Sequence, residues 1–231
     1  MRTGWKIIAG MALLLGTTVM ARAEDTGSLS GRITIAGTAP APKRIEATKD
    51  SEVCGKHPIF DESLLVGPDK GVKNVIVIVE GAKGGKFVSQ KAVLDQKGCI
   101  YSPHVVVVPT TGELAILNSD GVLHNIHSYS TLNPPFNVAQ PKFKKVVTER
   151  FAKSEIIKAT CDAHNWMQGW IVATDHPFVA VTDNEGRFAI RDLPPGHYKV
   201  EIWQETLGKQ VKDVSIRAKE DTKLNLELAK K

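Results

Sequence analysis

The chain has 231 residues, with 30 basic and 25 acidic side chains and a formal net charge of +5. This small excess argues against a nucleic-acid-binding protein, for which a basic stripe is expected. A chain of this length can bury a complete core, as one large domain or two small ones.

Residues 1–23 have the pattern of a secretory signal peptide. A short basic start precedes an apolar run at 7–20, which is too short to span a bilayer comfortably, and residues 21–23 form an Ala-Arg-Ala cleavage signature. These 23 residues hold three of the 30 basic side chains and none of the 25 acidic ones, so the remainder has a formal charge of +2. We therefore expect a periplasmic or secreted protein without a membrane-spanning segment. An uncleaved amphipathic anchor is the alternative.

Three cysteines remain, Cys54, Cys99 and Cys161. An odd number in an oxidising compartment leaves one cysteine outside any internal pair, so that thiol needs another role. There is no C-x-x-C-H motif, and covalent haem is therefore not indicated.

The rest of the chain predicts an all-β protein, because short β-branched runs alternate with turns and no segment has a strong helical period. The predicted strands comprise 28–37, 74–81, a pair within 104–121, 155–162 and 169–175, followed by four short strands between 178 and 218. This spacing is typical of β-sandwiches and barrels. His104, at the start of one strand, is interpreted as a histidine satisfied by the backbone.

A domain boundary is predicted near residues 175–177. The sequence after it, TDNEGRFAIRDLPPGHYKVEIW at 182–203, resembles the carboxypeptidase regulatory-like module, a small transthyretin-type β-sandwich. The resemblance rests on turn and core residues, so it predicts a fold for 176–231 and says little about function. The strand at 28–37 resembles the first strand of such modules and is a candidate to be shared with this one.

Cys161, His164 and Met167 lie three residues apart in CDAHNWMQGW, residues 161–170. Thiolate and thioether are soft donors and imidazole is intermediate, so the set suits copper better than zinc. Ordinary core packing and a Cys–His nucleophile are the alternatives. A further ligand must come from elsewhere, and the upstream segment NSDGVLHNIHS offers two histidines, His124 and His127.

His124-Asn125 followed by C-x-x-H-x-x-M is similar to the cupredoxin family, with the short ligand loop of its amicyanin-like members. The resemblance covers about residues 70–175 and implies a Greek-key β-sandwich, with 24–175 as the copper domain. The implied ligands of one type 1 copper are His124, Cys161, His164 and, as the weak axial ligand, Met167. Asn125 is implied to join the two ligand loops by hydrogen bonds. His127 departs from the family pattern, and three interpretations are open: it is an extra ligand, it replaces His124, or it faces solvent.

With Cys161 on the metal, Cys54 and Cys99 are left to form a disulfide; two buried thiols are the alternative. The family resemblance also places the ring edge of His164 near the surface, where electrons would pass to a partner. Trp166 is then a candidate docking patch, with plain packing as the competing interpretation.

We therefore expect a secreted blue-copper protein that carries single electrons to a redox partner such as a cytochrome or an oxidoreductase. The rival functions are a copper carrier or buffer without electron transfer, and a surface or matrix β-protein with a secondary copper site. A copper enzyme is least favoured, because four protein ligands leave no open position for a substrate.

Overall fold

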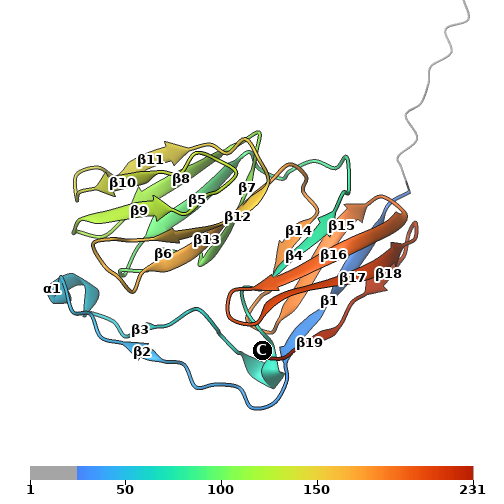
Figure 1. The fold of residues 1–231 in the computed structure, drawn as a ribbon, viewed down its shortest axis with the longest axis horizontal. Coiled ribbons are helices and arrows are strands. Elements are labelled where there is room, and N and C mark those ends of the chain that lie inside the picture. The colour runs from blue at the N-terminus through green and yellow to red at the C-terminus, as the bar shows by residue number, and fades with distance from the viewer. Residues whose placement is uncertain (1–24, 231) are drawn as a thin grey trace, which may run out of the picture.

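The structure is a computed structural model and describes residues 25–230; the predicted signal peptide lies outside these residues. The described chain forms two β-sandwiches that lie side by side, with a long strap running beneath them (Figure 1). The predicted all-β class with two sandwiches is confirmed. Within the described residues, no helix has the length and apolar character needed to cross a membrane.

The first sandwich packs a five-stranded sheet on a four-stranded one. The five-stranded sheet has the order β10-β9-β12-β13-β7, formed by β7 (Val105–Pro109), β9 (His124–Ser128), β10 (Asn137–Gln140), β12 (Glu155–Thr160) and β13 (Gln168–Thr174). The other has the order β11-β8-β5-β6, formed by β5 (Lys91–Gln96), β6 (Tyr101–Ser102), β8 (Glu113–Asn118) and β11 (Val146–Glu149). β13 is parallel to β7 and β5 is parallel to β8, so the chain crosses between sheets instead of forming only hairpins.

Alternation along the strands builds the core of this sandwich. In β8, Leu114 and Ile116 are fully buried, while Glu113, Ala115 and Leu117, which alternate with them, are partly exposed. In β12, Ile157 and Ala159 point inward in the same way. A period of two is what a strand with one buried face requires.

The second sandwich draws strands from both ends of the described chain. One sheet has the order β15-β1-β18, with β19 also paired to β1; its strands are β1 (Gly27–Ile35), β15 (Arg187–Leu193), β18 (Asp221–Lys223) and β19 (Leu226–Leu228). The other has the order β14-β4-β16-β17, formed by β4 (Ile76–Glu80), β14 (Val179–Val181), β16 (Gly196–Gln204) and β17 (Gly208–Ile216). The strand predicted at 28–37 therefore lies in this sandwich as β1.

The predicted start of the copper domain near residue 70 is wrong, because β4 does not belong to the first sandwich. It pairs with β14 and β16 in the second sandwich instead of entering the first. Both faces of β4 are buried. Val77 and Val79 pack in the core of the second sandwich, while Ile76 packs against the first sandwich. An apolar run that is buried on both faces does not reveal which sheet it joins.

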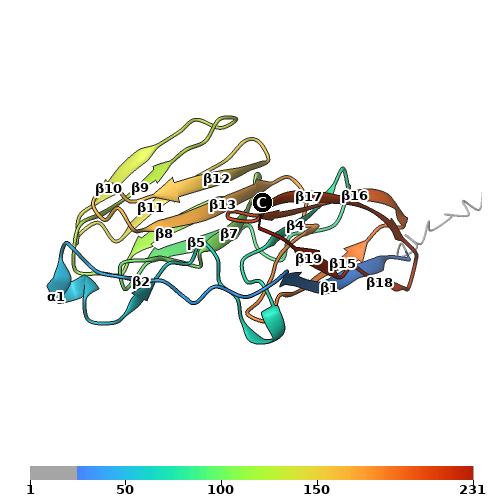
Figure 2. The ribbon, with the colours of Figure 1, turned by 60° about the horizontal axis from the view of Figure 1, so that its bottom comes forward.

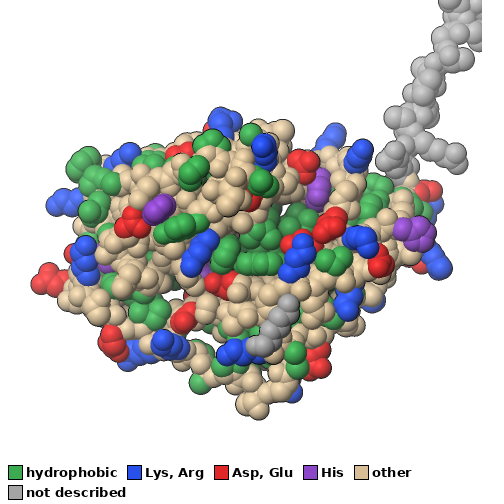
Figure 3. Space-filling view, viewed as in Figure 1, with side chains coloured by type: hydrophobic (Ala, Val, Ile, Leu, Met, Phe, Trp, Pro, Cys, Tyr) green, Lys and Arg blue, Asp and Glu red, His purple; other side chains and the backbone are tan. Residues whose placement is uncertain are grey.

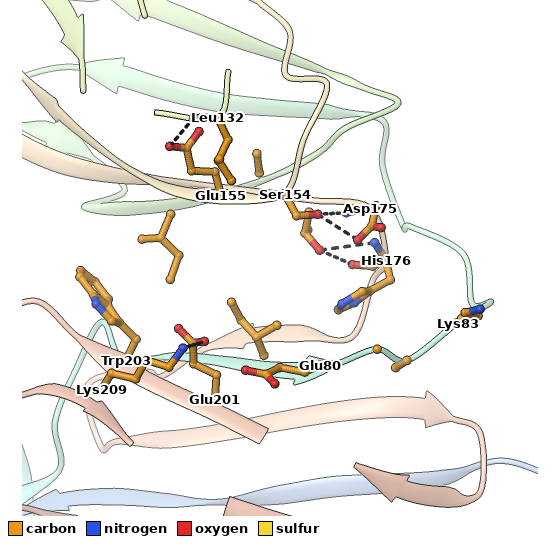
Figure 4. Close-up of a pocket in the computed structure, with 16 residues that line it drawn as sticks. Glu80, Lys83, Leu132, Ser154, Glu155, Asp175, His176, Glu201, Trp203 and Lys209 are labelled. Carbon is orange, nitrogen blue, oxygen red and sulfur yellow. Dashed lines mark hydrogen bonds and ion pairs between the residues drawn. The ribbon is translucent and has the colours of Figure 1, made fainter. Parts of the chain in front are cut away.

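The two sandwiches meet through apolar side chains. Ile76, Val105 and Val172 are buried between them, and the Trp170 and Trp203 rings meet edge to face at a centroid distance of 4.5 Å. Beside this contact lies a cleft of about 700 Å³, into which side chains from both sandwiches face (Figure 4). On the side of the molecule drawn in Figure 3, basic and acidic side chains are intermingled, in keeping with the small net charge.

The strap, residues 36–67, leaves the second sandwich, reaches the far end of the first and returns (Figures 1 and 2). Its two arms pair antiparallel through β2 (Arg44–Ile45) and β3 (Ile59–Phe60), the short helix α1 (Ser51–Cys54) forms its tip, and the 3₁₀ turn η1 (Pro68–Lys70) follows it. A Cys54–Cys99 disulfide fixes the tip to the first sandwich, which confirms the predicted pairing.

Candidate metal centre

The predicted ligands come from the start of one strand and from the loop between two others. His124 opens β9, while Cys161, His164 and Met167 lie between β12 and β13. β9 and β12 pair antiparallel, with His127 opposite Thr160, and extending this register places His124 opposite the loop that holds His164. The loop is closed by its own backbone, because Cys161 N donates to Met167 O at 3.1 Å and Met167 N donates to His164 O at 3.0 Å.

The structure brings His124, Cys161 and His164 together. The two Nδ1 atoms lie 3.0 Å apart, and the Cys161 Sγ lies 3.8 Å from His164 Nδ1. One ligand atom from each of the three residues lies within 4.8 Å of the others, and all three residues are at least 98% buried. Met167 is 1% exposed and packs in the same core cluster as Cys161.

The outer nitrogen of each imidazole is bonded to a carboxylate. His124 Nε2 lies 2.9 Å from Asp120 Oδ2, and His164 Nε2 lies 2.8 Å from Asp50 Oδ2. A carboxylate that accepts the outer N–H fixes the ring and directs the lone pair of the other nitrogen inward, as in carboxylate–histidine–metal arrangements. One thiolate and two inward imidazole nitrogens in a buried pocket are therefore a donor set that fits copper.

Asn125 connects the two ligand loops in the way the sequence resemblance implied. Its Oδ1 accepts from the backbone N–H of Asp162 at 2.7 Å and from that of Ala163 at 3.2 Å. Its own backbone N–H donates to Cys161 Sγ at 3.5 Å. The side chain also donates to Asn137 and Asp162 from Nδ2, at 2.7 and 3.1 Å. The position of the sulfur is thus tied to the strand that carries His124.

The electrostatics of the pocket favour a thiolate. Burial raises the pKa of Cys161, but hydrogen bonds from His124 and from nearby backbone N–H groups outweigh this and lower that pKa below its usual value. Burial also works against charge on His124, yet its hydrogen bonds with Asp120 and Cys161 raise the pKa of His124 to about 9. Burial and the charge on His124 lower the pKa of His164, since two imidazoles in contact do not both hold a proton readily.

His127 and Trp166 do not join this cluster. The His127 side chain is 32% exposed; its Nδ1 lies 3.1 Å from Asp162 Oδ1, and its ring stacks on Tyr129. Trp166 is half-buried, with its N–H donating to Cys99 O at 3.1 Å and its ring edge-on to His164. The docking role of Trp166 stays a prediction.

Two expectations are wrong. His164 is fully buried instead of presenting a ring edge at the surface, because Asp50 at the tip of the strap covers its outer nitrogen. His104 is not satisfied by backbone: its Nε2 lies 2.5 Å from Glu205 Oε1, and its Nδ1 lies 3.7 Å from Glu62 Oε2.

The two carboxylates of the site were not predicted from the sequence. Asp120 had a local signal, because it precedes His124 by four residues in a turn-rich segment. Asp50 lies 114 residues before His164, and only its nearness to Cys54 connects it with this end of the sandwich. A second group, Cys99, Asp120 and His124, is also compact, but the Cys99 sulfur is in the disulfide and is not a thiolate donor.

Residues 170–229 match the carboxypeptidase regulatory-like domain. This range begins within β13 of the first sandwich, covers β14 to β19, and leaves out β1 and β4, which complete the second sandwich. No curated protein matches the chain.

Several solved structures are similar to parts of the chain. The copper-containing nitrite reductase NirK of Thermus scotoductus SA-01 is 19% identical, with a TM-score of 0.34, over 41% of this chain and 24% of its own. The chain therefore spans about a quarter of that enzyme's length. A purple cupredoxin of Nitrosopumilus maritimus is 20% identical over 36% of this chain and 98% of its own, with a TM-score of 0.31. An oxidised amicyanin variant is 16% identical over 49% and 93%, with a TM-score of 0.32.

Proposed function

We propose that this chain binds one copper ion of type 1 and carries single electrons between redox partners. The ligands are His124, Cys161 and His164, with Met167 as the weak axial donor. The observation that carries the proposal is the convergence of a thiol with two Nδ1 atoms in a buried pocket, each imidazole held from outside by a carboxylate. Bound copper would supply the one-electron exchange.

The protein's contribution is rigidity and exclusion of water. The ligand loop is closed by backbone hydrogen bonds, Asn125 joins it to β9, and the disulfide holds Asp50 against His164. Ligands that stay fixed in both oxidation states need little reorganisation when the electron moves. Four protein donors leave no position for a substrate, so we propose an electron carrier and not an enzyme.

The compartment and the partner belong to the same proposal. A disulfide that closes a loop between residues 45 apart suits an oxidising compartment, and we place the protein in the periplasm or outside the cell. The partner would be a redox protein such as a cytochrome or an oxidoreductase.

Cu(II) loading followed by visible absorption and EPR spectroscopy tests the ligand set. Cys161→Ser should abolish the intense charge-transfer band, because that band needs a copper–thiolate bond. His124→Ala should abolish or strongly shift the band, while His127→Ala, the matched histidine on the same strand, should leave it near that of the wild type. The reverse order of the two histidine variants would show that the assignment is wrong.

Repeated reduction and oxidation then separates an electron carrier from a copper carrier. We expect reversible one-electron cycling with copper retained against a moderate Cu(I) chelator. Stoichiometric loss of copper on each reduction would instead indicate delivery or storage.

A further inference from the structure

The C-terminal sandwich reaches the ligand loop through one turn. Glu205 lies in the turn between β16 and β17, and its Oε2 accepts a hydrogen bond from Gln168 Nε2 at 3.0 Å. Gln168 directly follows the axial candidate Met167. The other oxygen of Glu205 lies 2.5 Å from His104 Nε2, so one carboxylate holds two segments of the first sandwich.

The second segment supports the ligand loop as well. His104 immediately precedes β7, and its backbone oxygen accepts from Trp170 N at 2.8 Å. Trp170 lies on β13, the strand that leaves the ligand loop, and is opposite Val105 of β7. Glu205 therefore bonds to Gln168, which lies on β13, and to His104, which precedes β7, the strand next to β13.

The contact is buried, so it carries more weight than a surface pair. The side chains of His104 and Glu205 are 2% and 9% exposed. Among the described residues Glu205 has no lysine or arginine partner, and its two carboxylate oxygens are bonded to His104 and Gln168. A buried carboxylate is costly unless its partners are well placed, which favours a role in fixing their geometry.

The turn that presents Glu205 is itself fixed. Gln204 Oε1 accepts from the backbone N–H of Thr206 and of Leu207 at 2.7 and 2.8 Å, while Gln204 Nε2 donates to Ser63 O of the strap at 2.7 Å. Thr206 Oγ1 donates to the same Ser63 oxygen at 2.9 Å. The turn thus presents a preorganised carboxylate.

A small cavity of about 20 Å³ lies next to Met167 and is lined by Glu62, His104, Trp166, Met167 and Gln168, among others. This volume holds about one water molecule. His104 Nδ1 is buried and has no hydrogen-bond partner within residues 25–230, and Glu62 Oε2 of the strap lies 3.7 Å from it. The wall next to the axial candidate is therefore built by the strap and the first sandwich, and Glu205 of the C-terminal sandwich holds two of its residues, His104 and Gln168.

We propose that Glu205 is a positioning residue for the metal centre, through which the C-terminal sandwich fixes the Met167 side of the ligand loop. Its role toward copper rests on the proposed function, but its role in holding the loop does not. The C-terminal sandwich is then a structural part of the metal centre and not a separate binding module.

Hydrogen exchange of the metal-free, full-length protein tests the positioning directly. The amides of Met167 and Trp170 are both hydrogen-bonded and report on the two segments that Glu205 holds. In Glu205→Ala, and less so in Glu205→Gln, these amides should exchange about tenfold faster or more, as expected when a hydrogen bond to a charged group is lost. Asp213→Asn is the matched control, since the Asp213 carboxylate pairs with Lys199 at the surface of the same sandwich and has no other side-chain partner in the part of the chain that the structure describes.

A double-substitution cycle tests whether Glu205 acts through Gln168. The exchange effects of Glu205→Ala and Gln168→Ala at Met167 should be strongly non-additive. In the copper-loaded protein, Glu205→Gln should change the EPR parameters and shift the reduction potential, while Asp213→Asn should leave both unchanged. Exchange rates in both Glu205 variants equal to those of Asp213→Asn would overturn the proposal. A wild-type protein without a copper–thiolate spectrum would overturn the proposed function alone.

Discussion

Replacing Asn125 by alanine should destabilise the metal-free protein, because this side chain joins the two ligand loops. Asn125 is 7% exposed, and its amide accepts two backbone N–H groups and donates to two side-chain oxygens. A hydrogen bond in a protein contributes about 0.5–1.5 kcal/mol net. Some of these four bonds would be replaced by water, since Asp162 is exposed, so we expect a loss of about 2–3 kcal/mol.

Urea unfolding of the metal-free protein measures this loss, with the m-value expected to stay constant. Asn165→Ala is the control, because Asn165 is an exposed asparagine in the same loop without a side-chain hydrogen bond among the described residues. If Asn125→Ala unfolded within about 0.5 kcal/mol of Asn165→Ala, the reasoning that this amide clamps the loops would be refuted.

The disulfide, Asp50 and Glu155 each allow a further prediction. Replacing both Cys54 and Cys99 by alanine should lower the free energy of unfolding by about 2–4 kcal/mol, as measured by urea titration, because the disulfide closes a long loop. Asp50→Ala should make His164 of the metal-free protein reactive toward diethylpyrocarbonate, as mapped by mass spectrometry, whereas wild-type His164 should stay protected. Burial raises the pKa of Glu155, but hydrogen bonds from the 130–133 loop outweigh it and set that pKa at about 2, against an ordinary 4.5.

The sign of the Glu155 effect follows from this lowered pKa. A carboxyl that is more acidic in the folded state stabilises the fold above pH 4.5, and this contribution is lost as the pH falls toward 2. Glu155→Gln should therefore be less stable at neutral pH and lose stability less steeply in acid, as measured by thermal unfolding across that range. Equal acid profiles for variant and wild type would contradict this.

The sequence predicted the features that depend on local spacing. The C-x-x-H-x-x-M loop and the His124-Asn125 pair each lie within a few residues, and the antiparallel register of β9 and β12 brings them together. The long-range contacts had no such pattern. Glu205 lies 101 residues from His104 and Asp50 lies 114 residues from His164, so no periodicity or motif connects them. A single acidic residue in a turn looks the same whether it faces solvent or a buried histidine.

The pairing of β1 has a consequence for how the chain acquires its fold. β1 needs β15, β18 and β19 as partners, and the hydrogen bond between Ser28 and Asp221 joins residues 193 apart. The nine strands of the first sandwich, β5 to β13, lie between β4 and β14 in the sequence, so one sandwich is inserted into the other. The backbone hydrogen-bonding groups of β1 therefore stay unpaired until β15, β18 and β19 are available. Such high contact order slows folding and leaves strand edges available for aggregation, so the yield of folded protein depends on protecting β1 during that interval.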